Sequence, residues 1–304
     1  MPRIKIGTRG SPLALAQAHE TSARLIAAHG FSPEDIEIIP ISTTGDRIKD
    51  RPLAEIGGKG LFTKEIEEAL LAGDINLAVH SMKDMPAVLP AGLTITTILP
   101  REDPRDAFLS PVANSIEELR IGATVGSSSV RRTAQLLRFR PDLKSVQFRG
   151  NVETRLRKLA EGVADATFLA CAGLNRLGLS DRITKAMPIE IMLPAIAQGA
   201  IAIEIREDDE ATRALLAPIN HYESHVAVAC ERAFLKALNG SCRTPIAGHA
   251  TLNGKTLSFR GHALTLDGIH CFETTREGAV EDAARMGEEA GQEVKARGGA
   301  LIAF

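Results

Sequence analysis

The chain contains no tryptophan and only one tyrosine among its 304 residues, and its formal net charge is −2 at pH 7. Proteins that bind nucleic acids usually combine a basic surface with aromatic side chains on which bases stack. The composition therefore argues against a nucleic-acid-binding protein. Hydrophobic residues form 44% of the chain and charged residues 24%, which is typical of a globular protein with a full core.

Long apolar runs and paired cysteines are also missing. The longest apolar stretch, residues 193–205, is interrupted by a glutamine and a glutamate and is too short to cross a bilayer. The first residues lack the basic, apolar and small-residue order of a signal peptide. None of the four cysteines lies in a C-x-x-C pair, which argues against a zinc knuckle or a thioredoxin-like site. We therefore expect a cytoplasmic protein with free thiols and no contact with a membrane.

Positive charge is concentrated in one part of the chain, residues 120–158. This window holds ten Lys or Arg residues and two acidic residues, a net charge of +8, so the remainder carries −10. Arg131 and Arg132 follow a Gly-Ser-Ser-Ser turn, while Arg149 and Arg155 flank a Gly-Asn turn. Both turns fall at expected strand-to-helix junctions, where backbone N–H and guanidinium groups can converge on an anion. The pattern indicates a ligand with several negative charges.

The first two thirds of the chain alternate short apolar strands with helices, a pattern typical of mixed sheets covered by helices. The expected strands are residues 4–7, 36–41, 77–79, 121–125, 145–148 and 166–170, and the expected helices are residues 12–29, 63–71, 130–139 and 152–159. The pattern restarts near Asp106, which indicates two α/β lobes. Two extended segments, residues 93–105 and 192–205, would join the lobes as a double hinge beside a ligand-binding cleft.

The chain after residue 219 follows a different pattern. A helix is expected over residues 223–238, followed by an Asn-Gly turn at 253–254 and an Asp-Gly turn at 267–268. These turns predict a three-stranded antiparallel sheet, with a last helix at residues 280–296. The expected domains are a first lobe of residues 1–99 and 195–218, an arginine-rich, carboxylate-binding lobe of residues 100–194, and a small α+β domain of residues 219–304.

Two short motifs in the first lobe suit a ligand, and each also has a structural explanation. Ser11 before Pro12 is a regular helix start, but together with Arg9 it also suits a carboxylate or phosphate. Residues 57–60, Gly-Gly-Lys-Gly, lack the Ser or Thr of a nucleotide-binding P-loop. They form either a loop that closes over a ligand or a passive surface loop.

A third motif, Lys83 and Asp84, follows a buried strand, and ligands bind at strand ends in α/β sheets. An adjacent lysine and aspartate can divide anion binding and proton transfer between them, or they belong to a solvated loop. The neighbouring His80 is expected to be hydrogen-bonded within the fold.

Cys242 is the only cysteine predicted to lie outside regular structure, in a loop before the antiparallel sheet. Arg243 beside it would make the thiol more nucleophilic, and an inert loop cysteine is the alternative. The other cysteines are explained by a buried strand, an apolar helix face and an alternating strand, for Cys171, Cys230 and Cys271 respectively.

Taken together, these segments resemble the porphobilinogen deaminase family, also called the hydroxymethylbilane synthases. The similar stretches keep the family's order and cover nearly the whole chain, at residues 7–17, 57–62, 78–86, 101–108, 126–132, 149–155, 170–178, 194–204 and 240–246. Each motif is weak by itself, whereas the joint match is highly specific. The resemblance implies two lobes like those of periplasmic binding proteins and a third domain that carries a cofactor loop.

The resemblance also implies an activity. The family are transferases that join four porphobilinogen molecules head to tail, release ammonia at each step and form the linear tetrapyrrole hydroxymethylbilane of heme biosynthesis. The product grows on a dipyrromethane cofactor, which a thioether attaches to a loop cysteine; by motif this is Cys242. Such an anchor needs no histidine base. We expect a monomer, and no metal ion in the site.

By motif position, the family's binding residues correspond to basic and hydroxyl side chains of this chain. The residues expected to bind the cofactor are Lys83, Asp84, Ser127, Ser129, Arg131, Arg132 and Arg155. The residues expected to bind substrate carboxylates are Arg9, Ser11, Arg149, Arg155 and Arg176. Asp84 is also expected to be the acid–base group, and Lys59 to lie in a lid. Bidentate guanidinium pairing suits the acetate and propionate groups of each pyrrole.

Two residues depart from the family's pattern, because Ala197 and Ala247 stand where the family usually has glycine. Both lie at hinge or cofactor-loop positions, so they bear on local flexibility. The alternative from another class is a non-catalytic, two-lobed binding protein for a polyanionic small molecule. That alternative explains the arginines but not Cys242 in a loop.

Overall fold

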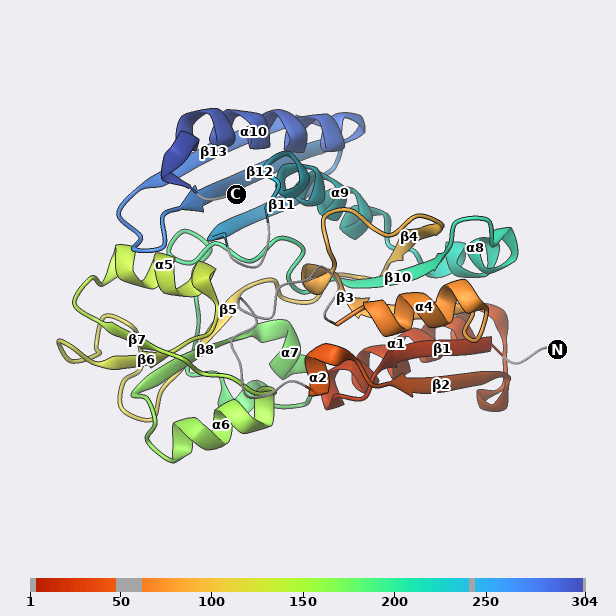
Figure 1. The fold of residues 1–304 in the computed structure, drawn as a ribbon, viewed down its shortest axis with the longest axis horizontal. Coiled ribbons are helices and arrows are strands. Elements are labelled where there is room, and N and C mark those ends of the chain that lie inside the picture. The colour runs from red at the N-terminus through yellow and green to blue at the C-terminus, as the bar shows by residue number, and fades with distance from the viewer. Residues whose placement is uncertain (1–3, 48–61, 241–243, 303–304) are drawn as a thin grey trace. The chain divides into compact units, whose positions relative to one another are not determined.

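The computed structural model describes residues 4–47, 62–240 and 244–302, which form two compact units (Figure 1). The first unit contains the chain up to Arg101 together with Ala200–His225. The second contains Glu102–Gly199 and the chain from Val226 onward. The chain therefore crosses between the units three times. The crossings after Arg101 and after Gly199 lie inside segments expected to be extended, and the crossing after His225 lies in a helix. The division of the second unit into a lobe and a separate C-terminal domain stays a prediction.

A five-stranded mixed sheet forms the centre of the first unit, in the order β2-β1-β3-β10-β4. Its strands are β1 Ile4–Arg9, β2 Ile36–Ile41, β3 Leu77–Ser81, β4 Leu93–Ile98 and β10 Ile201–Arg206. β1 pairs in parallel with β2 and β3, whereas β10 runs antiparallel between β3 and β4. The carboxyl ends of β1 and β3 therefore meet at one edge of the sheet.

Helices cover both faces of this sheet. They are α1 Pro12–His29, α2 Thr44–Arg47, α4 Lys64–Ala72 and α8 Glu210–Leu216. The apolar face of α1 packs in one core with Leu77 and Val79, while α4 packs in another with Ala78. Successive strand residues point to opposite faces, so α1 and α4 lie on opposite sides of β3.

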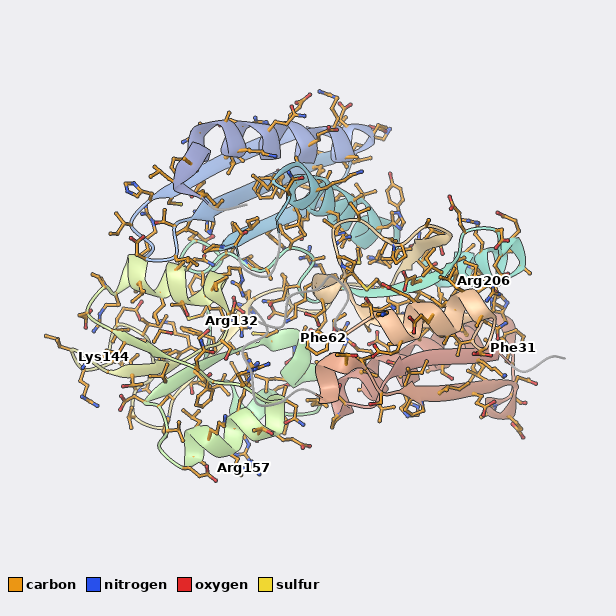
Figure 2. All side chains as sticks on the ribbon, in the orientation of Figure 1. Phe31, Phe62, Arg132, Lys144, Arg157 and Arg206 are labelled. Atoms are coloured by element: carbon orange, nitrogen blue, oxygen red, sulfur yellow. The ribbon has the colours of Figure 1, made fainter. Side chains whose placement is uncertain are left out.

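The second unit contains another five-stranded mixed sheet, in the order β7-β6-β8-β5-β9. Its strands are β5 Asp106–Leu109, β6 Thr124–Gly126, β7 Lys144–Val146, β8 Ala166–Ala170 and β9 Lys185–Ala186. β6 is parallel to both β7 and β8, and β5 is antiparallel to β8. Lys144 on the edge strand β7 points into solvent, where a charge discourages further strand pairing (Figure 2).

Each of the three parallel strands of this sheet leads into a helix. The helices are α5 Val130–Phe139 after β6, α6 Val152–Ala160 after β7 and α7 Cys171–Arg176 after β8. Ser129 caps α5 by accepting the Arg132 N–H at 3.4 Å, and Asn151 caps α6 by accepting the Thr154 N–H at 2.9 Å. Polar caps at these junctions satisfy backbone N–H groups that have no partner within the helix.

The carboxyl-terminal part of the second unit is a three-stranded antiparallel sheet. Its strands are β11 Ile246–Asn253, β12 Thr256–Leu264 and β13 Cys271–Ala279, and its helices are α9 Tyr222–Ala237 and α10 Ala283–Gly298. The two helices approach closely at Gly287, where a Cβ would lie 2.0 Å from the Cys230 carbonyl oxygen. Short 3-10 turns complete the chain at Pro33–Asp35, Met82–Asp84, Ser180–Arg182, Ala217–Ile219, Val280–Asp282 and Gly299–Leu301.

The predicted class, α/β with two mixed sheets and a C-terminal three-stranded antiparallel sheet, is confirmed. Three local predictions were wrong. The strand expected from Ile121 begins at Thr124, because Gly122 before it takes a φ of 73°. The strand expected to reach Phe148 ends earlier, since the Phe148 N–H donates to the Ser128 hydroxyl at 3.0 Å. Cys171, expected in a strand, begins α7.

The two departures from the glycine pattern have different consequences. Ala197 has a φ of 58°, in the left-handed region that favours glycine, and its N–H donates to Glu231 Oε2 at 2.6 Å. Ala247 is an ordinary buried residue of β11, paired with His262. The structure therefore gives a conformational reason for glycine at position 197 but not at position 247.

Candidate active site

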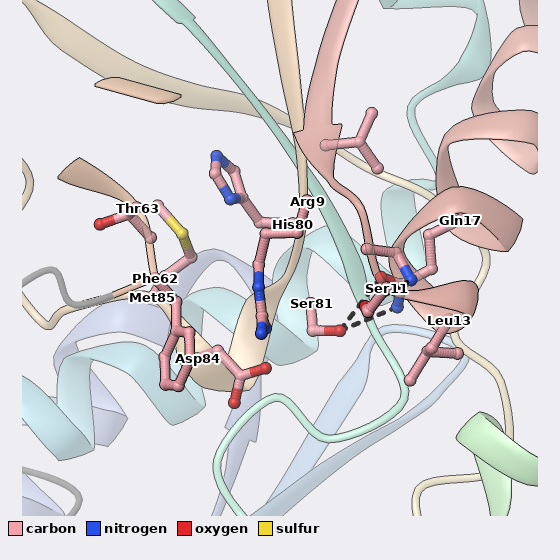
Figure 3. A pocket seen from close by; sticks show the side chains of 12 residues that line it. Arg9, Ser11, Leu13, Gln17, Phe62, Thr63, His80, Ser81, Asp84 and Met85 are labelled. Atoms are coloured by element: carbon pink, nitrogen blue, oxygen red, sulfur yellow. Dashed lines mark hydrogen bonds between the residues drawn. The ribbon is translucent and has the colours of Figure 1, made fainter. Parts of the chain in front are cut away.

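A pocket lies in the first unit where β1 and β3 end (Figure 3). The polar side chains that line it belong to Arg9, Ser11, Gln17, Thr63, His80, Ser81 and Asp84. Arg9 and Ser11 lie at the junction of β1 and α1, while Asp84 ends the 3-10 turn after β3. The parallel pairing of β1 and β3 thus brings together three predicted site residues that are far apart in the sequence.

The start of α1 builds one wall of this pocket. Ser11 has extended backbone and accepts the Ala14 N–H at 3.4 Å, which confirms the predicted helix cap. Further along α1, Gln17 Nε2 donates to Ser81 Oγ at 2.9 Å, and the Ser81 hydroxyl donates to Gln17 Oε1 at 3.1 Å (Figure 3). These bonds hold the helix start against the end of β3.

Charged groups of both signs line the same pocket. The Arg9 guanidinium lies 4.3 Å from the ring centre of Phe62, a cation–π contact that orients it. Asp84 is exposed on the pocket wall, and Lys83 before it is exposed as well. A cation, an aromatic ring and a solvent-accessible carboxylate can together bind an acidic ligand and exchange a proton with it.

Buried ionisable groups lie behind this pocket. His80 Nε2 is 3.0 Å from Glu204 Oε2, and both side chains are buried. This pair confirms that His80 is hydrogen-bonded within the fold. Burial raises the pKa of the nearby Glu67, although a hydrogen bond from Thr63 lowers it. Glu204 belongs to β10, which lies between β3 and β4, and it is therefore next to His80 of β3.

The second unit gathers arginines at one edge of its sheet. Arg131 and Arg132 follow β6, Arg149 and Arg155 follow β7, and Arg176 ends the helix after β8. These three strands are parallel neighbours, so their carboxyl ends share one edge. The structure therefore places all five predicted arginines in the segments that follow this one edge, as the strand-to-helix junctions indicated.

Arg131 and Arg132 both turn inward to Asp106, the first residue of β5. Arg131 Nη1 and Nη2 donate to the two carboxylate oxygens at 2.7 and 3.1 Å. Arg132 Nε and Nη2 donate to Asp106 Oδ1 at 2.9 and 2.6 Å. Burial by itself would raise the pKa of Asp106, but the two guanidinium groups hold it well below its usual range.

This buried cluster carries an unbalanced charge. Two cations and one anion leave a net charge of +1, and each side chain is at most 7% exposed. Gln198 Nε2 also donates to Asp106 Oδ1, at 3.1 Å. A buried charge without a counter-charge is unfavourable, so the cluster suits an anionic ligand.

Asp106 is a further candidate site residue that was not predicted from the sequence. The family-like stretch 101–108 contains it, but no role was assigned to it. The available signal was an acidic residue at the start of an otherwise apolar strand, Asp106–Leu109. A carboxylate buried in that position needs a cationic partner, and the nearby arginine-rich window could have supplied one.

Of the remaining predicted residues of the second unit, Ser127 is buried, whereas Arg149, Arg155 and Arg176 are only half-buried. Arg155 Nε donates to the Gly150 carbonyl at 2.9 Å, and Arg176 Nη2 donates to the Gly199 carbonyl at 3.1 Å. Ser127 Oγ accepts the Ser129 N–H at 3.2 Å, which shapes the turn before α5.

Cys242 and Lys59 lie outside the described residues. Of the other cysteines, Cys171 and Cys230 are buried, and burial raises the pKa of each thiol to about 12. These two thiols are therefore unreactive at neutral pH. Burial of both was expected from the sequence, although Cys171 lies at a helix start and not in the expected strand.

Comparisons with known proteins identify the class of protein to which this fold and site belong. Residues 4–214 match the model described as porphobilinogen deaminase, dipyromethane cofactor binding domain. Residues 225–296 match the model described as porphobilinogen deaminase, C-terminal domain. The chain thus combines a cofactor-binding α/β part with a C-terminal domain.

Curated relatives agree with both models. The porphobilinogen deaminase of Nitrobacter winogradskyi is 57% identical over 97% of this chain and 93% of its own length. That of Paracoccus denitrificans is 58% identical over 97% of this chain and 94% of its own length. The chain belongs to the porphobilinogen deaminase family.

Among solved structures, the methionine-binding protein MetQ aligns with a TM-score of 0.46 at 14% identity, over 74% of this chain and 94% of that one. This likeness is too weak to bear on function. Among the helices in the described ranges, none combines the length and apolar character that crossing a membrane requires.

Proposed function

We propose that this protein carries out the family's reaction, the condensation of four porphobilinogen molecules into hydroxymethylbilane, with the residues of the two edges described above. The observation that carries the proposal is the buried cluster of Arg131, Arg132 and Asp106, with its charge of +1. Every pyrrole carries an acetate and a propionate, so the growing product accumulates carboxylates. Guanidinium groups are their natural bidentate partners.

The donor set of the second unit fits a dipyrromethane cofactor. Arg131, Arg132 and Arg155, with the hydroxyl groups of Ser127 and Ser129, offer N–H and O–H donors to its carboxylates. In the first unit we assign Lys83 and Asp84 to the same cofactor. When bound through a thioether to Cys242, dipyrromethane would supply the pyrrole carbon to which the first substrate is joined.

We assign the substrate carboxylates to basic residues of each unit. In the first unit they are Arg9 and Ser11, which both line the pocket. Arg9 offers a guanidinium group, and Ser11 lies at the start of a helix. In the second unit they are Arg149, Arg155 and Arg176. Lys59 is assigned to a lid over the substrate.

Asp84 is proposed as the acid–base group. Loss of ammonia leaves a cationic pyrrole, and a carboxylate near its N–H stabilises that charge. Asp84 can donate a proton to the leaving amine and accept the proton that the coupled carbon releases. The two transfers balance, so each condensation returns Asp84 to its starting state. Its exposure on the pocket wall supports exchange with water between steps.

We further propose that the protein is a monomer and that it works in the cytoplasm. We also propose three domains: a first lobe of residues 1–99 and 195–218, a second lobe of residues 100–194, and a C-terminal domain of residues 219–304. Two boundaries of the first lobe, at residues 99 and 195, are supported by the crossings between the compact units after Arg101 and after Gly199, whereas the compact unit itself continues to His225.

The decisive experiment is the intact mass of the native protein beside that of a Cys242→Ala variant. The native protein should exceed its polypeptide mass by two linked pyrrole units, and the variant should not. Incubation with porphobilinogen then separates an enzyme from a binding protein, because only the enzyme releases ammonia. An unmodified native protein that binds porphobilinogen without ammonia release would contradict the proposal.

A further inference from the structure

Three side chains with metal-binding atoms lie on one face of the C-terminal sheet. His262 on β12 is paired in register with Glu273 on β13, and Cys271 lies two residues before Glu273 on the same face. An imidazole nitrogen, a thiol sulfur and a carboxylate oxygen all lie within 4.8 Å of one another. Strand register thus brings together three different donor types.

His262 is buried, and one of its ring nitrogens has no hydrogen-bond partner in the described part of the chain. Its side chain is only 5% exposed, and its Nε2 has no hydrogen-bond partner among the residues that the structure describes. Buried polar atoms are rarely left without a partner in folded proteins. The imidazole of His262 lies in a cluster with a thiol and a carboxylate. A metal ion that accepts a nitrogen lone pair would give this buried ring a partner.

We propose that His262, Cys271 and Glu273 bind one zinc ion, with water as the fourth ligand. Imidazole, thiolate and carboxylate are the three side-chain ligands that zinc takes in proteins, usually in a tetrahedron. Binding releases the Cys271 proton to solvent, and the two anionic ligands then balance the charge of Zn²⁺. Cys271 and Glu273 are partly exposed, which gives the ion a path to the site.

The surrounding charges are compatible with this neutral centre. Arg260 Nε and Nη2 pair with the two oxygens of Glu273 at 3.0 and 3.1 Å. One of these oxygens can bind zinc while the other stays paired with Arg260. The negative charge of Glu190 also interacts favourably with Arg260. Arg131 is already balanced in part by Asp106, and Arg138 donates to the Ile269 carbonyl at 3.2 Å.

The location of the site indicates what the ion would do. His262 and Cys271 flank the turn that joins β12 to β13, and this turn contacts α5 (Figure 1). Gly268 in the turn has a φ of 74°, and a Cβ there would lie 2.3 Å from the Ala134 carbonyl oxygen of α5. Zinc would brace the two strands beside this contact, a structural role outside the condensation chemistry.

Zinc titration of the chelator-treated holoenzyme tests the proposal. Bound metal is counted by mass spectrometry after dialysis, and cobalt substitution reports a thiolate ligand through its sulfur-to-metal absorption band. We expect one zinc ion per chain. Cys271→Ser and Glu273→Gln should each weaken binding about tenfold or more, judged against the losses seen when metal-site partners are removed. Zinc should also raise the melting temperature of the native protein but not of Cys271→Ser.

Two controls separate this site from other thiols. Cys171→Ser removes a buried cysteine elsewhere in the second unit, and Cys242→Ala removes the cofactor anchor; both should keep zinc affinity. The two test substitutions change partly exposed side chains, and their folding is checked by circular dichroism in chelator. No stoichiometric zinc, unchanged affinity in Cys271→Ser, or loss of zinc only in Cys242→Ala would each overturn the proposal.

Discussion

Arg131 and Asp106 form a two-point ion pair inside the second unit, with Nη1 to Oδ2 at 2.7 Å and Nη2 to Oδ1 at 3.1 Å. The same carboxylate accepts two hydrogen bonds from Arg132. One acidic residue therefore sets the positions of two arginines that are assigned to cofactor carboxylates. We therefore expect Asp106 to act as a positioning residue for the proposed carboxylate-binding arginines.

Replacement of this carboxylate should be costly. Asp106→Asn keeps the shape of the side chain but leaves two buried guanidinium groups without a counter-charge. We expect the free energy of unfolding to fall by about 3–5 kcal/mol, the usual loss when one partner of a buried ion pair is removed. Urea unfolding measures the loss, and intact mass should show a smaller fraction of chains with cofactor.

Asp142→Asn is the matched control for that variant. Asp142 pairs with Arg140 at 2.7 Å in the same unit, but both side chains are partly exposed. Its removal should cost about 1 kcal/mol or less. Equal stability of the Asp106→Asn variant and the native protein would show that Asp106 does not organise the arginines.

Asp84→Asn should stop turnover while the cofactor stays attached. The amide can neither donate nor accept the proton, and general acid–base groups contribute about 100- to 10,000-fold. Ammonia release from porphobilinogen measures the rate, and intact mass shows the cofactor. Asp74→Asn, at an exposed position in the same unit, is the control and should keep native turnover. Near-native turnover of the Asp84 variant would remove this residue from the mechanism.

Arg155→Leu should impair cofactor assembly or elongation without unfolding the protein. Arg155 is half-buried at the first turn of α6, so the loss of one charge-assisted bond to a carboxylate should slow turnover about ten- to hundredfold. An intact-mass series of enzyme–substrate species shows the step at which elongation stalls. Arg157→Leu, on the exposed side of the same helix (Figure 2), should show no stall. Identical series for both variants would refute the assignment.

Stability should depend on pH through His262. Burial, with Arg260, Arg131 and Arg138 nearby, lowers the pKa of this imidazole from 6.5 to about 3. Between these values the unfolded chain binds a proton that the folded chain excludes, so stability present above pH 6.5 is lost as pH falls toward 3.

A His262→Gln variant isolates this effect. In chelator, the native protein should lose up to about 1.4 kcal/mol of unfolding free energy per pH unit more than the variant over this range. Urea unfolding at several pH values measures the difference. His270→Gln, at an exposed position in the same hairpin, should keep the native slope. Parallel slopes for the native protein and the His262 variant would show that the imidazole is not held neutral by the fold.

Much of the local structure could be predicted because its causes are local. The helix at Pro12–His29 begins with a serine cap and a proline and ends at Gly30, whose φ is 68°. The C-terminal sheet follows from its two Gly-containing turns, since Gly254 and Gly268 both take positive φ. The strand boundaries at Thr124 and Val146 could not be predicted, because one depends on a turn and the other on a bond to Ser128.

The sequence predicts a set of candidate site residues but not their arrangement. The arginine-rich window and the family-like motifs indicate which side chains bind carboxylates. They do not show that Arg131 and Arg132 share one buried carboxylate, or that His80 pairs with Glu204. Both relationships depend on which strands lie next to each other.

The sequence by itself determined the family, the α/β class, the helix ends and turns, and the concentration of positive charge. These depend on residue type, local backbone sterics and spacing along the chain. Only the tertiary structure decided that β10 runs antiparallel between β3 and β4. It also decided that the arginine-bearing segments after β7, β6 and β8 start from one edge of a sheet, and that His262 lies beside Cys271 and Glu273. These contacts follow from strand order and register, which long-range packing selects and which no local pattern encodes.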